Sequence, residues 1–244
     1  MVTLMPSASR SRRSAVVGPA DFKSIRLFAD VPEAHLQELA RIAWQEKLPP
    51  RTVVIEQDAP CEALYALPEG TVEVLSGLDD QETVIEVVGP GSVLLLACVV
   101  TAIPYIASVR TLSPARILAV PAAAVRKLFD GDKAFARSVA AELSRSSCRM
   151  LLDLQSLKVR TSIERLADWL IDAAGAQANG NGEFRLLFGK RTLASRLGMT
   201  PECLSRSLRT LSGHGIRVHG REVILADRAA LAAFAGKESV TSDQ

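Results

Sequence analysis

The chain has 244 residues, 48% hydrophobic and 23% charged, a composition typical of one large or two small globular domains and unlike a disordered or disulfide-built chain. The longest apolar run, Val93–Val100, is far shorter than the roughly 18 residues of a membrane span, and no apolar core of a secretory signal follows the N-terminal arginines. The four cysteines lack C-x-x-C spacing, so we expect no metal site. We expect the protein to lie in the reducing cytoplasm.

The net charge of +2 hides an uneven distribution along the chain. Residues 21–130 carry 15 acidic and 9 basic side chains, whereas residues 160–236 carry 11 basic and 7 acidic ones. An excess of four positive charges is modest by itself. Its confinement to the second half of the chain nevertheless favours a polyanionic partner, such as double-stranded DNA.

The first part of the chain divides into a tail, a helical segment and a β-rich region. Residues 1–20 are rich in Ser, Arg and small side chains, and we expect a disordered tail there. A helix is expected shortly after Pro32, where apolar residues recur at helical spacing. Within 21–131, short β-rich runs alternate with Gly, Pro and Asp clusters, which predicts a small β-roll or barrel. The predicted strands are 52–55, 63–67, 71–75, 83–88, 107–111 and 116–120.

Residues 132–159 have the periodicity of a single long helix. Their apolar and small side chains alternate spacings of four and three, as in the seam of a two-stranded coiled coil over about three heptads. The alternative is a helix that packs only on its own β-roll. We favour a parallel dimer helix, with the interface residues Ala136, Ala140, Leu143, Ser147, Met150, Leu154 and Leu157.

The segment Lys190–Leu211 has the pattern of a helix-turn-helix. A short helix with an apolar face leads to Gly198, which can adopt a positive φ at the turn. Thr200 is a natural N-cap for the second helix. Pro201 takes the first helical position, where a missing N–H costs nothing. The buried stripe of this second helix is expected to be Leu204, Leu208 and Leu211.

The opposite face of the second helix carries polar side chains suited to reading bases. Arg206 can bind guanine through two hydrogen bonds, Glu202 can accept one from a cytosine amino group, and Ser205 can bond to a base or phosphate. A solvated face with an ion pair between Glu202 and Arg206 is the alternative, but the adjoining turn and the preceding long helix favour base reading. The expected DNA-binding residues are Glu202, Ser205, Arg206, Arg209, Thr200, Arg191 and Thr192.

Nearly the whole chain resembles the cAMP receptor protein/fumarate-nitrate reductase regulator (Crp-Fnr) family. Residues 200–206, with their E-x-x-S-R pattern, resemble the recognition helix of its Fnr-like branch. Residues 157–167 resemble the hinge and first DNA-domain helix of the nitric-oxide-responsive members. The resemblance implies an α+β fold: a β-roll of the cupin-like, cyclic-nucleotide-binding type, a long dimerisation helix, and a winged helix-turn-helix over 160–236 before a tail at 237–244. Ser207 replaces an apolar residue of the family, and we expect Leu208 to take over its packing.

The function implied by this resemblance is transcription regulation. A homodimer would bind a palindromic operator with TTGAT-like half-sites and act together with RNA polymerase. An enzyme is not expected, because the sequence has only three histidines and no G-x-S-x-G, Walker or metal-ligand motif. The alternative is a ligand-binding β-roll that regulates a protein partner and whose degenerate helix-turn-helix no longer binds DNA.

The β-roll departs from the family members that bind cyclic nucleotides. Those members hold the ribose and the cyclic phosphate with a Gly-Glu and an Arg-Ser pair, and the matching positions here supply neither carboxylate nor cation. We therefore expect no cAMP. No iron–sulfur cluster is expected either, because clustered N-terminal cysteines are missing. Two interpretations remain for a group of apolar residues: they form a pocket for an apolar effector such as haem, or they simply belong to the core. These residues are Leu95, Leu96, Cys98, Tyr105 and Ile106.

Cys203 is a candidate redox site inside the second helix of the helix-turn-helix. It lies at the third helical position if Thr200 is the cap, where the helix N-terminus and nearby arginine lower a thiol pKa. Oxidation at this position would block contact with DNA. An inert, partly buried thiol is the alternative.

Overall fold

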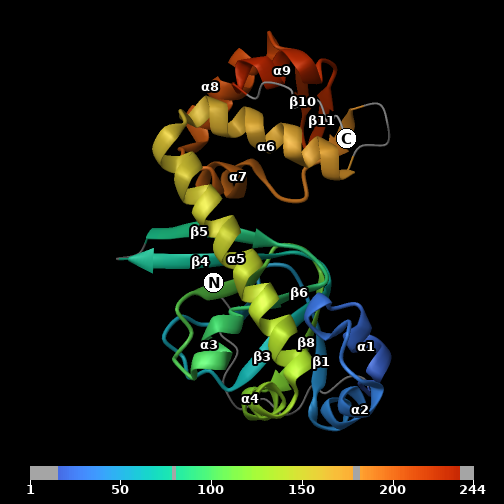
Figure 1. Cartoon of the computed structure of the whole chain (residues 1–244). Helices are drawn as coiled ribbons and strands as arrows, with labels where there is room; N and C mark the ends of the chain where they lie inside the picture. The colour runs from blue at the N-terminus through green and yellow to red at the C-terminus, as the bar shows by residue number, and fades with distance from the viewer. Residues whose placement is uncertain (1–15, 79–80, 178–181, 237–244) are drawn as a thin grey trace. The chain divides into compact units, whose positions relative to one another are not determined.

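The computed structural model describes residues 16–78, 81–177 and 182–236, which form two compact units, one within Met1–Cys148 and the other within Arg149–Gln244 (Figure 1). Residues 1–15 of the tail expected at 1–20, and the whole tail expected at 237–244, lie outside the described residues. The predicted tail boundary at residue 20 is wrong, because Val17 is buried and helix α1 already begins at Pro19. An apolar side chain at position 17 thus joins the core. No helix of the described ranges is long and apolar enough to span a membrane.

The first unit is a β-roll built from two antiparallel four-stranded sheets, as predicted. One sheet has the order β1-β8-β3-β6 and the other β2-β7-β4-β5. The strand bounds are β1 Trp44–Leu48, β2 Val53–Ile55, β3 Ala63–Glu69, β4 Val72–Leu78, β5 Gln81–Val88, β6 Ser92–Leu94, β7 Ser108–Thr111 and β8 Ala115–Pro121. Strands β1 and β6 are additional to the six predicted ones.

Short helices cover the β-roll and join its core. They are α1 Pro19–Lys23, the 3-10 helix η1 Arg26–Phe28, α2 Glu33–Ile42, α3 Leu96–Thr101 and α4 Ala122–Gly131. Phe28 contacts Phe22 edge-on at 5.1 Å between ring centroids and stacks on Phe135 at 5.8 Å. Each fully buried large apolar side chain contributes about 1.5–3 kcal/mol to the free energy of unfolding. This aromatic cluster therefore stabilises the packing of the N-terminal helices against the start of the long helix.

The long helix α5 spans Lys133–Val159, one residue shorter than predicted. Asp132 caps its N-terminus, because the Asp132 Oδ1 accepts hydrogen bonds from the backbone N–H groups of Ala134 and Phe135 at 2.8 and 2.9 Å. Phe135 and Val139 are buried in the β-roll core, and Leu143 packs against it. The first half of α5 therefore packs on its own β-roll.

The second unit is a winged helix-turn-helix domain. Its elements are α6 Ser162–Gln177, β9 Glu183–Arg185, α7 Lys190–Arg196, α8 Pro201–Ser212, β10 Ile216–His219, β11 Glu222–Leu225 and α9 Arg228–Phe234. The three strands form an antiparallel sheet in the order β10-β11-β9. Leu166, Leu170, Leu204, Leu211 and Leu231 are fully buried, so the apolar faces of α6, α8 and α9 share one core.

Candidate nucleic-acid interface

The turn between α7 and α8 has the geometry that the sequence predicts. Gly198 adopts a φ of +62°, and its backbone N–H donates to the Ser195 carbonyl at 3.0 Å. The Thr200 Oγ1 accepts a hydrogen bond from the backbone N–H of Cys203 at 3.2 Å. Pro201 is the first residue of α8. The cap and the turn fix where α8 begins, and therefore which of its side chains face outward.

The buried face of α8 differs from the prediction at one position. Leu204 and Leu211 are fully buried as expected, but the third buried residue is Ser207, at 6% exposure, while Leu208 is only half-buried. Ser207 follows Leu204 by three residues and therefore lies on the same face. Its hydroxyl lies within hydrogen-bonding reach of the Cys203 thiol, which provides a local polar partner. The expectation that Leu208 replaces this packing is wrong.

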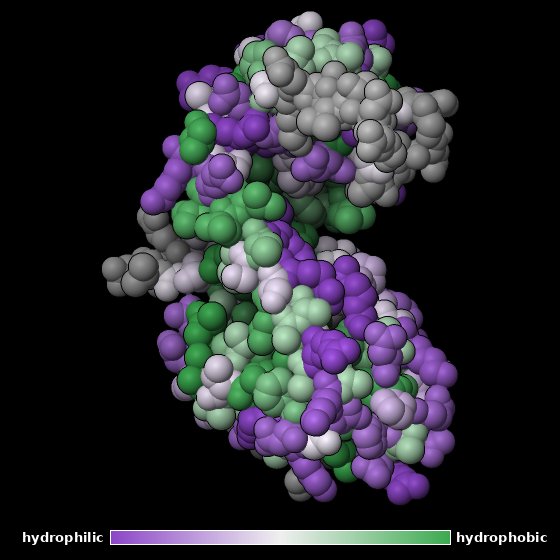
Figure 2. Space-filling view, in the orientation of Figure 1, coloured by the Kyte–Doolittle hydropathy of each residue, from purple (hydrophilic) through white to green (hydrophobic). Residues whose placement is uncertain are grey.

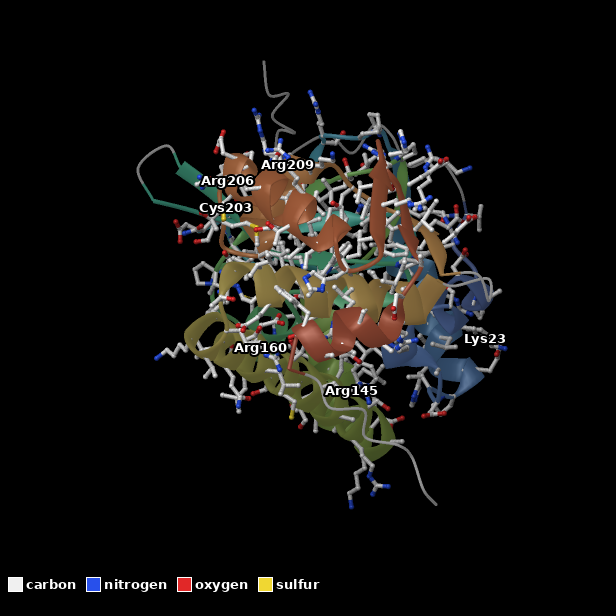
Figure 3. The ribbon with its side chains drawn as sticks, turned by 90° about the horizontal axis from the view of Figure 1, so that it is seen from above. Lys23, Arg145, Arg160, Cys203, Arg206 and Arg209 are labelled. Carbon is white, nitrogen blue, oxygen red and sulfur yellow. The ribbon has the colours of Figure 1, made fainter. Side chains whose placement is uncertain are left out.

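The outer face of α8 gathers the predicted reading residues. Glu202, Ser205, Arg206 and Arg209 are all exposed, and Figure 3 shows Arg206 and Arg209 extending from α8. The Ser205 hydroxyl donates to the Pro201 carbonyl at 2.9 Å, so its lone pairs are left to accept a hydrogen bond. The backbone N–H of Glu202, then the Thr200 hydroxyl and the Arg206 charge, lower the pKa of the Glu202 carboxyl. This face thus presents one carboxylate and two guanidinium groups.

Two further predicted DNA-binding residues lie on α7. Arg191 is exposed near the start of that helix, and Thr192 beside it is half-buried. Both precede the buried pair Leu193 and Ala194, which orients the exposed side of the helix. The Arg191 guanidinium is therefore available to an anionic group, while Thr192 offers less surface.

The β10–β11 hairpin, here called the wing, carries basic side chains that the sequence did not single out. Arg217, His219 and Arg221 are exposed, and Gly220 turns the hairpin with a φ of +60°. His219 lies opposite Glu222 in the strand register. Alternation along β10 places Arg217 and His219 on one side, and their exposure beside the buried Ile216 shows that this side is the outer one.

Cys203 has the environment expected of an activated thiol. Its Sγ lies 3.6 Å from the Ser162 Oγ of α6. This hydrogen bond is the main cause that lowers the pKa of the Cys203 thiol, with further contributions from the Ser207 hydroxyl and the Arg206 charge. The predicted direction of the shift is therefore confirmed. The leading cause is a neighbouring hydroxyl group rather than the arginine. Redox activity stays a prediction.

The predicted dimer-interface residues fall into two groups along α5. Ala136 and Leu143 are half-buried, and Ala140 and Ser147 are exposed. Met150, Leu154 and Leu157 are exposed at 59%, 48% and 48%, and Figure 2 shows a hydrophobic patch over this second half of α5. The second half of the helix thus presents the uncovered apolar surface that a partner helix would need.

The candidate effector residues do not line one common surface. Cys98 and Tyr105 are buried in one core cluster of the β-roll and Leu96 in another, Leu95 is half-buried, and Ile106 is 60% exposed. The Tyr105 hydroxyl donates to the Ala63 carbonyl at 2.5 Å, and burial raises its pKa. A haem at this place would require the core around Cys98 to open. Across the described ranges, no three His, Cys, Asp or Glu side chains group as a metal site.

A hollow in the described part of the first unit lies elsewhere. It has a volume of about 440 Å³ and is bordered by the segment before α1, by α2 and by the start of β1. Its lining combines the apolar Val17, Ala40 and Trp44 with the polar Gln37 and Arg41. None of the candidate effector residues contributes to it.

Comparison with known proteins agrees with this two-domain architecture. Residues 45–132 match the cyclic nucleotide-binding domain family, and residues 164–234 match the Crp-like helix-turn-helix domain family. Domains of the second family belong to transcription regulators that bind DNA. The fold and the site therefore define a DNA-binding regulator. With a cyclic nucleotide-binding-type domain before its helix-turn-helix, the chain has the domain architecture of the Crp family.

Solved structures share the fold at low sequence identity. FixK2 from Bradyrhizobium japonicum is 21% identical with a TM-score of 0.71, over 79% of this chain and 96% of that one. A CooA variant from Carboxydothermus hydrogenoformans is 18% identical with a TM-score of 0.68, over 80% and 88%. The c-di-GMP-responsive regulator CLP from Xanthomonas campestris is 19% identical with a TM-score of 0.67, over 80% and 99%. No curated protein sequence matches the chain.

Proposed function

We propose that the protein is a homodimeric, sequence-specific transcription regulator of the Fnr-like branch of the Crp-Fnr family, close to its nitric-oxide-responsive members. The observation that carries this proposal is the two-sided character of α8. Its buried side holds the helix in the domain, and its exposed side presents Glu202, Ser205 and Arg206 together. Side chains of these types, exposed on one helix after a helix-turn-helix turn, suit hydrogen bonding to base edges in the major groove.

The reading chemistry favours a palindrome with TTGAT-like half-sites. Arg206 would bind the O6 and N7 of the half-site guanine, and Glu202 would accept a hydrogen bond from the cytosine amino group of the same or the adjacent pair. The lowered pKa of Glu202 keeps its carboxylate charged for this role. Arg191 and Arg209 would hold phosphates, which position the helix without reading sequence.

The uncovered apolar surface of α5 supports the dimer. Met150, Leu154 and Leu157 follow spacings of four and three and remain exposed in the single chain. A second copy packed in parallel along this stripe would cover them. It would also place two recognition helices about one turn of DNA apart. The palindrome of the operator would then mirror the two-fold axis of the protein.

The signal that the β-roll senses is proposed from what its residues can supply. Leu95, Leu96, Tyr105 and Ile106 offer neither a carboxylate for a ribose nor a cation for a cyclic phosphate, so the signal is not cAMP. The scattered cysteines do not favour an iron–sulfur cluster. Haem with nitric oxide, or thiol redox chemistry, is the remaining proposal. We further propose that the protein acts in the cytoplasm, with RNA polymerase as a partner.

A DNA-binding measurement tests the proposed function. Fluorescence anisotropy would compare a duplex holding the TTGAT-type palindrome with a scrambled duplex of equal length, over a series of salt concentrations. We expect affinity to fall steeply with salt while the palindrome stays preferred, because phosphate contacts release counterions and base contacts discriminate. Equal, weak binding of both duplexes would reject DNA reading and favour the alternative, a β-roll module that acts on a protein partner.

A further inference from the structure

Arg165 connects the end of the long helix to the turn of the helix-turn-helix. From α6, its Nη1 donates to the Arg160 carbonyl at 2.8 Å. Its Nε and Nη2 donate to the Leu197 carbonyl at 3.0 and 2.9 Å, and Nη2 also lies 3.4 Å from the Gly198 carbonyl. One guanidinium group therefore spans the residue that follows α5 and the two residues that follow α7.

Two side-chain contacts reinforce the same junction. A Cβ added at Gly198 would lie 3.1 Å from the Leu157 Cδ2, so the last turn of α5 packs directly against the backbone of the turn. The Ser162 hydroxyl, at the start of α6, meets the Cys203 thiol of α8 at 3.6 Å. All these residues lie within the second unit. The end of α5 and the helix-turn-helix are thus joined at several points.

The chemistry of arginine is suited to this bridge. Its planar fork offers five N–H donors in fixed directions, whereas a lysine ammonium is a point charge that cannot span separated carbonyls in the same way. The Leu197 and Gly198 carbonyls follow the C-terminus of α7, where unpaired helix carbonyls favour a cation. Arg165 satisfies carbonyls on both sides of the junction and thereby fixes the angle at which the helix-turn-helix leaves α5.

We propose that Arg165 is a positioning residue for operator reading, which sets the direction of α8 relative to the end of the dimer helix. This role rests on the proposed function, because the direction of α8 matters most when two copies must reach two half-sites at once. Arg165 does not touch DNA in this role. It determines the separation of the two recognition helices, and so the half-site spacing that the dimer accepts.

The test compares Arg165→Lys with the wild type on three kinds of duplex. These are a single half-site, the full palindrome, and palindromes whose centre is lengthened or shortened by one or two base pairs. For Arg165→Lys we expect unchanged affinity for the half-site, an affinity for the full palindrome that is about tenfold or more lower, and a weaker preference among spacings. The reason is that a misdirected second DNA-binding domain of the dimer has a lower effective concentration at the second half-site. Arg228→Lys, an exposed arginine on α9, is the matched control and should behave as wild type.

The outcomes separate positioning from simple support of the fold. Thermal unfolding is measured on every variant, and Arg165→Gln, which keeps an N–H donor but not the fork, replaces Arg165→Lys if the latter does not fold. Equal losses on half-site and full palindrome, or an unchanged spacing preference, would overturn the positioning role. A wild-type protein that prefers no palindrome would instead overturn the proposed function, and the positioning role with it.

Discussion

The Ser162 hydroxyl lies 3.6 Å from the Cys203 thiol, so the start of α6 contacts α8 at the one sulfur atom of that helix. This contact lowers the pKa of Cys203 more than any other group does. A thiol with a lowered pKa becomes thiolate at a lower pH, and the thiolate is the reactive form. The same hydrogen bond therefore links domain packing to thiol reactivity.

The first prediction concerns the pH dependence of Cys203 alkylation. Because the pKa is lowered, the rate of reaction with iodoacetamide should reach half its maximum at a lower pH than for free cysteine. Removing the hydroxyl by Ser162→Ala should move that midpoint back upward. The rate is measured at the Cys203 peptide by mass spectrometry across a pH series, with operator DNA as a protecting control. A midpoint at or above that of free cysteine would contradict the assignment of Ser162.

The second prediction concerns the dimer helix. Met150→Glu should give a monomer with much weaker operator binding, because two carboxylates would face each other across the seam in place of apolar contacts. Leu143→Glu should also weaken the dimer, but Leu143 packs against its own β-roll core, so this change also destabilises the first unit. Met150→Glu is therefore the cleaner test, and sedimentation velocity gives the oligomeric state.

A matched control exists on the same helix. Leu152 is exposed at 63% but lies two residues from Met150, on the side of α5 away from the proposed seam. Leu152→Glu should leave the dimer intact. A Met150→Glu protein that sediments as a dimer, or a Leu152→Glu protein that does not, would show that the interface is not the predicted stripe.

The third prediction concerns cAMP. Isothermal titration should detect no specific binding, since the positions that would hold the ribose and the cyclic phosphate carry Leu95, Leu96, Tyr105 and Ile106. Tyr105 is moreover occupied with the Ala63 carbonyl. Operator binding by the same sample serves as the control for a folded protein. Saturable binding of cAMP in the micromolar range would overturn this prediction.

Elements that follow from local sequence patterns were predictable, whereas contacts between residues distant in the sequence were not. The heptad spacing gave α5 to within one residue, and the Thr200-Pro201 pair gave the start of α8, because both signals are local. Strand β1 was missed since its sequence, Trp-Gln-Glu-Lys-Leu, is mostly polar and becomes a strand by pairing with β8. Three of the effector residues, Leu95, Leu96 and Cys98, were grouped because they share one apolar run, which the fold divides at Leu95 between β6 and α3.

The choice between Ser207 and Leu208 shows the same limit of sequence-based prediction on α8. Hydrophobicity alone favours Leu208 for the buried stripe, but both residues flank the line through Leu204 and Leu211. Packing against the rest of the domain decides between them, and it buries the smaller side chain. The exposed reading face was nevertheless predicted, because its position depends only on helix periodicity and on the cap at Thr200.

The last prediction separates a base reader from a phosphate anchor on the two helices. Arg206→Ala should cost about 1–3 kcal/mol on the intact operator and abolish discrimination at the guanine pair, because a contact with two hydrogen bonds to that base is lost. Arg191→Ala should weaken all sequences alike and reduce the salt slope by about one, because a phosphate contact carries no sequence information. Both variants are measured against a panel of operators with single-base changes. Full discrimination by Arg206→Ala, together with its loss in Arg191→Ala, would exchange the two roles.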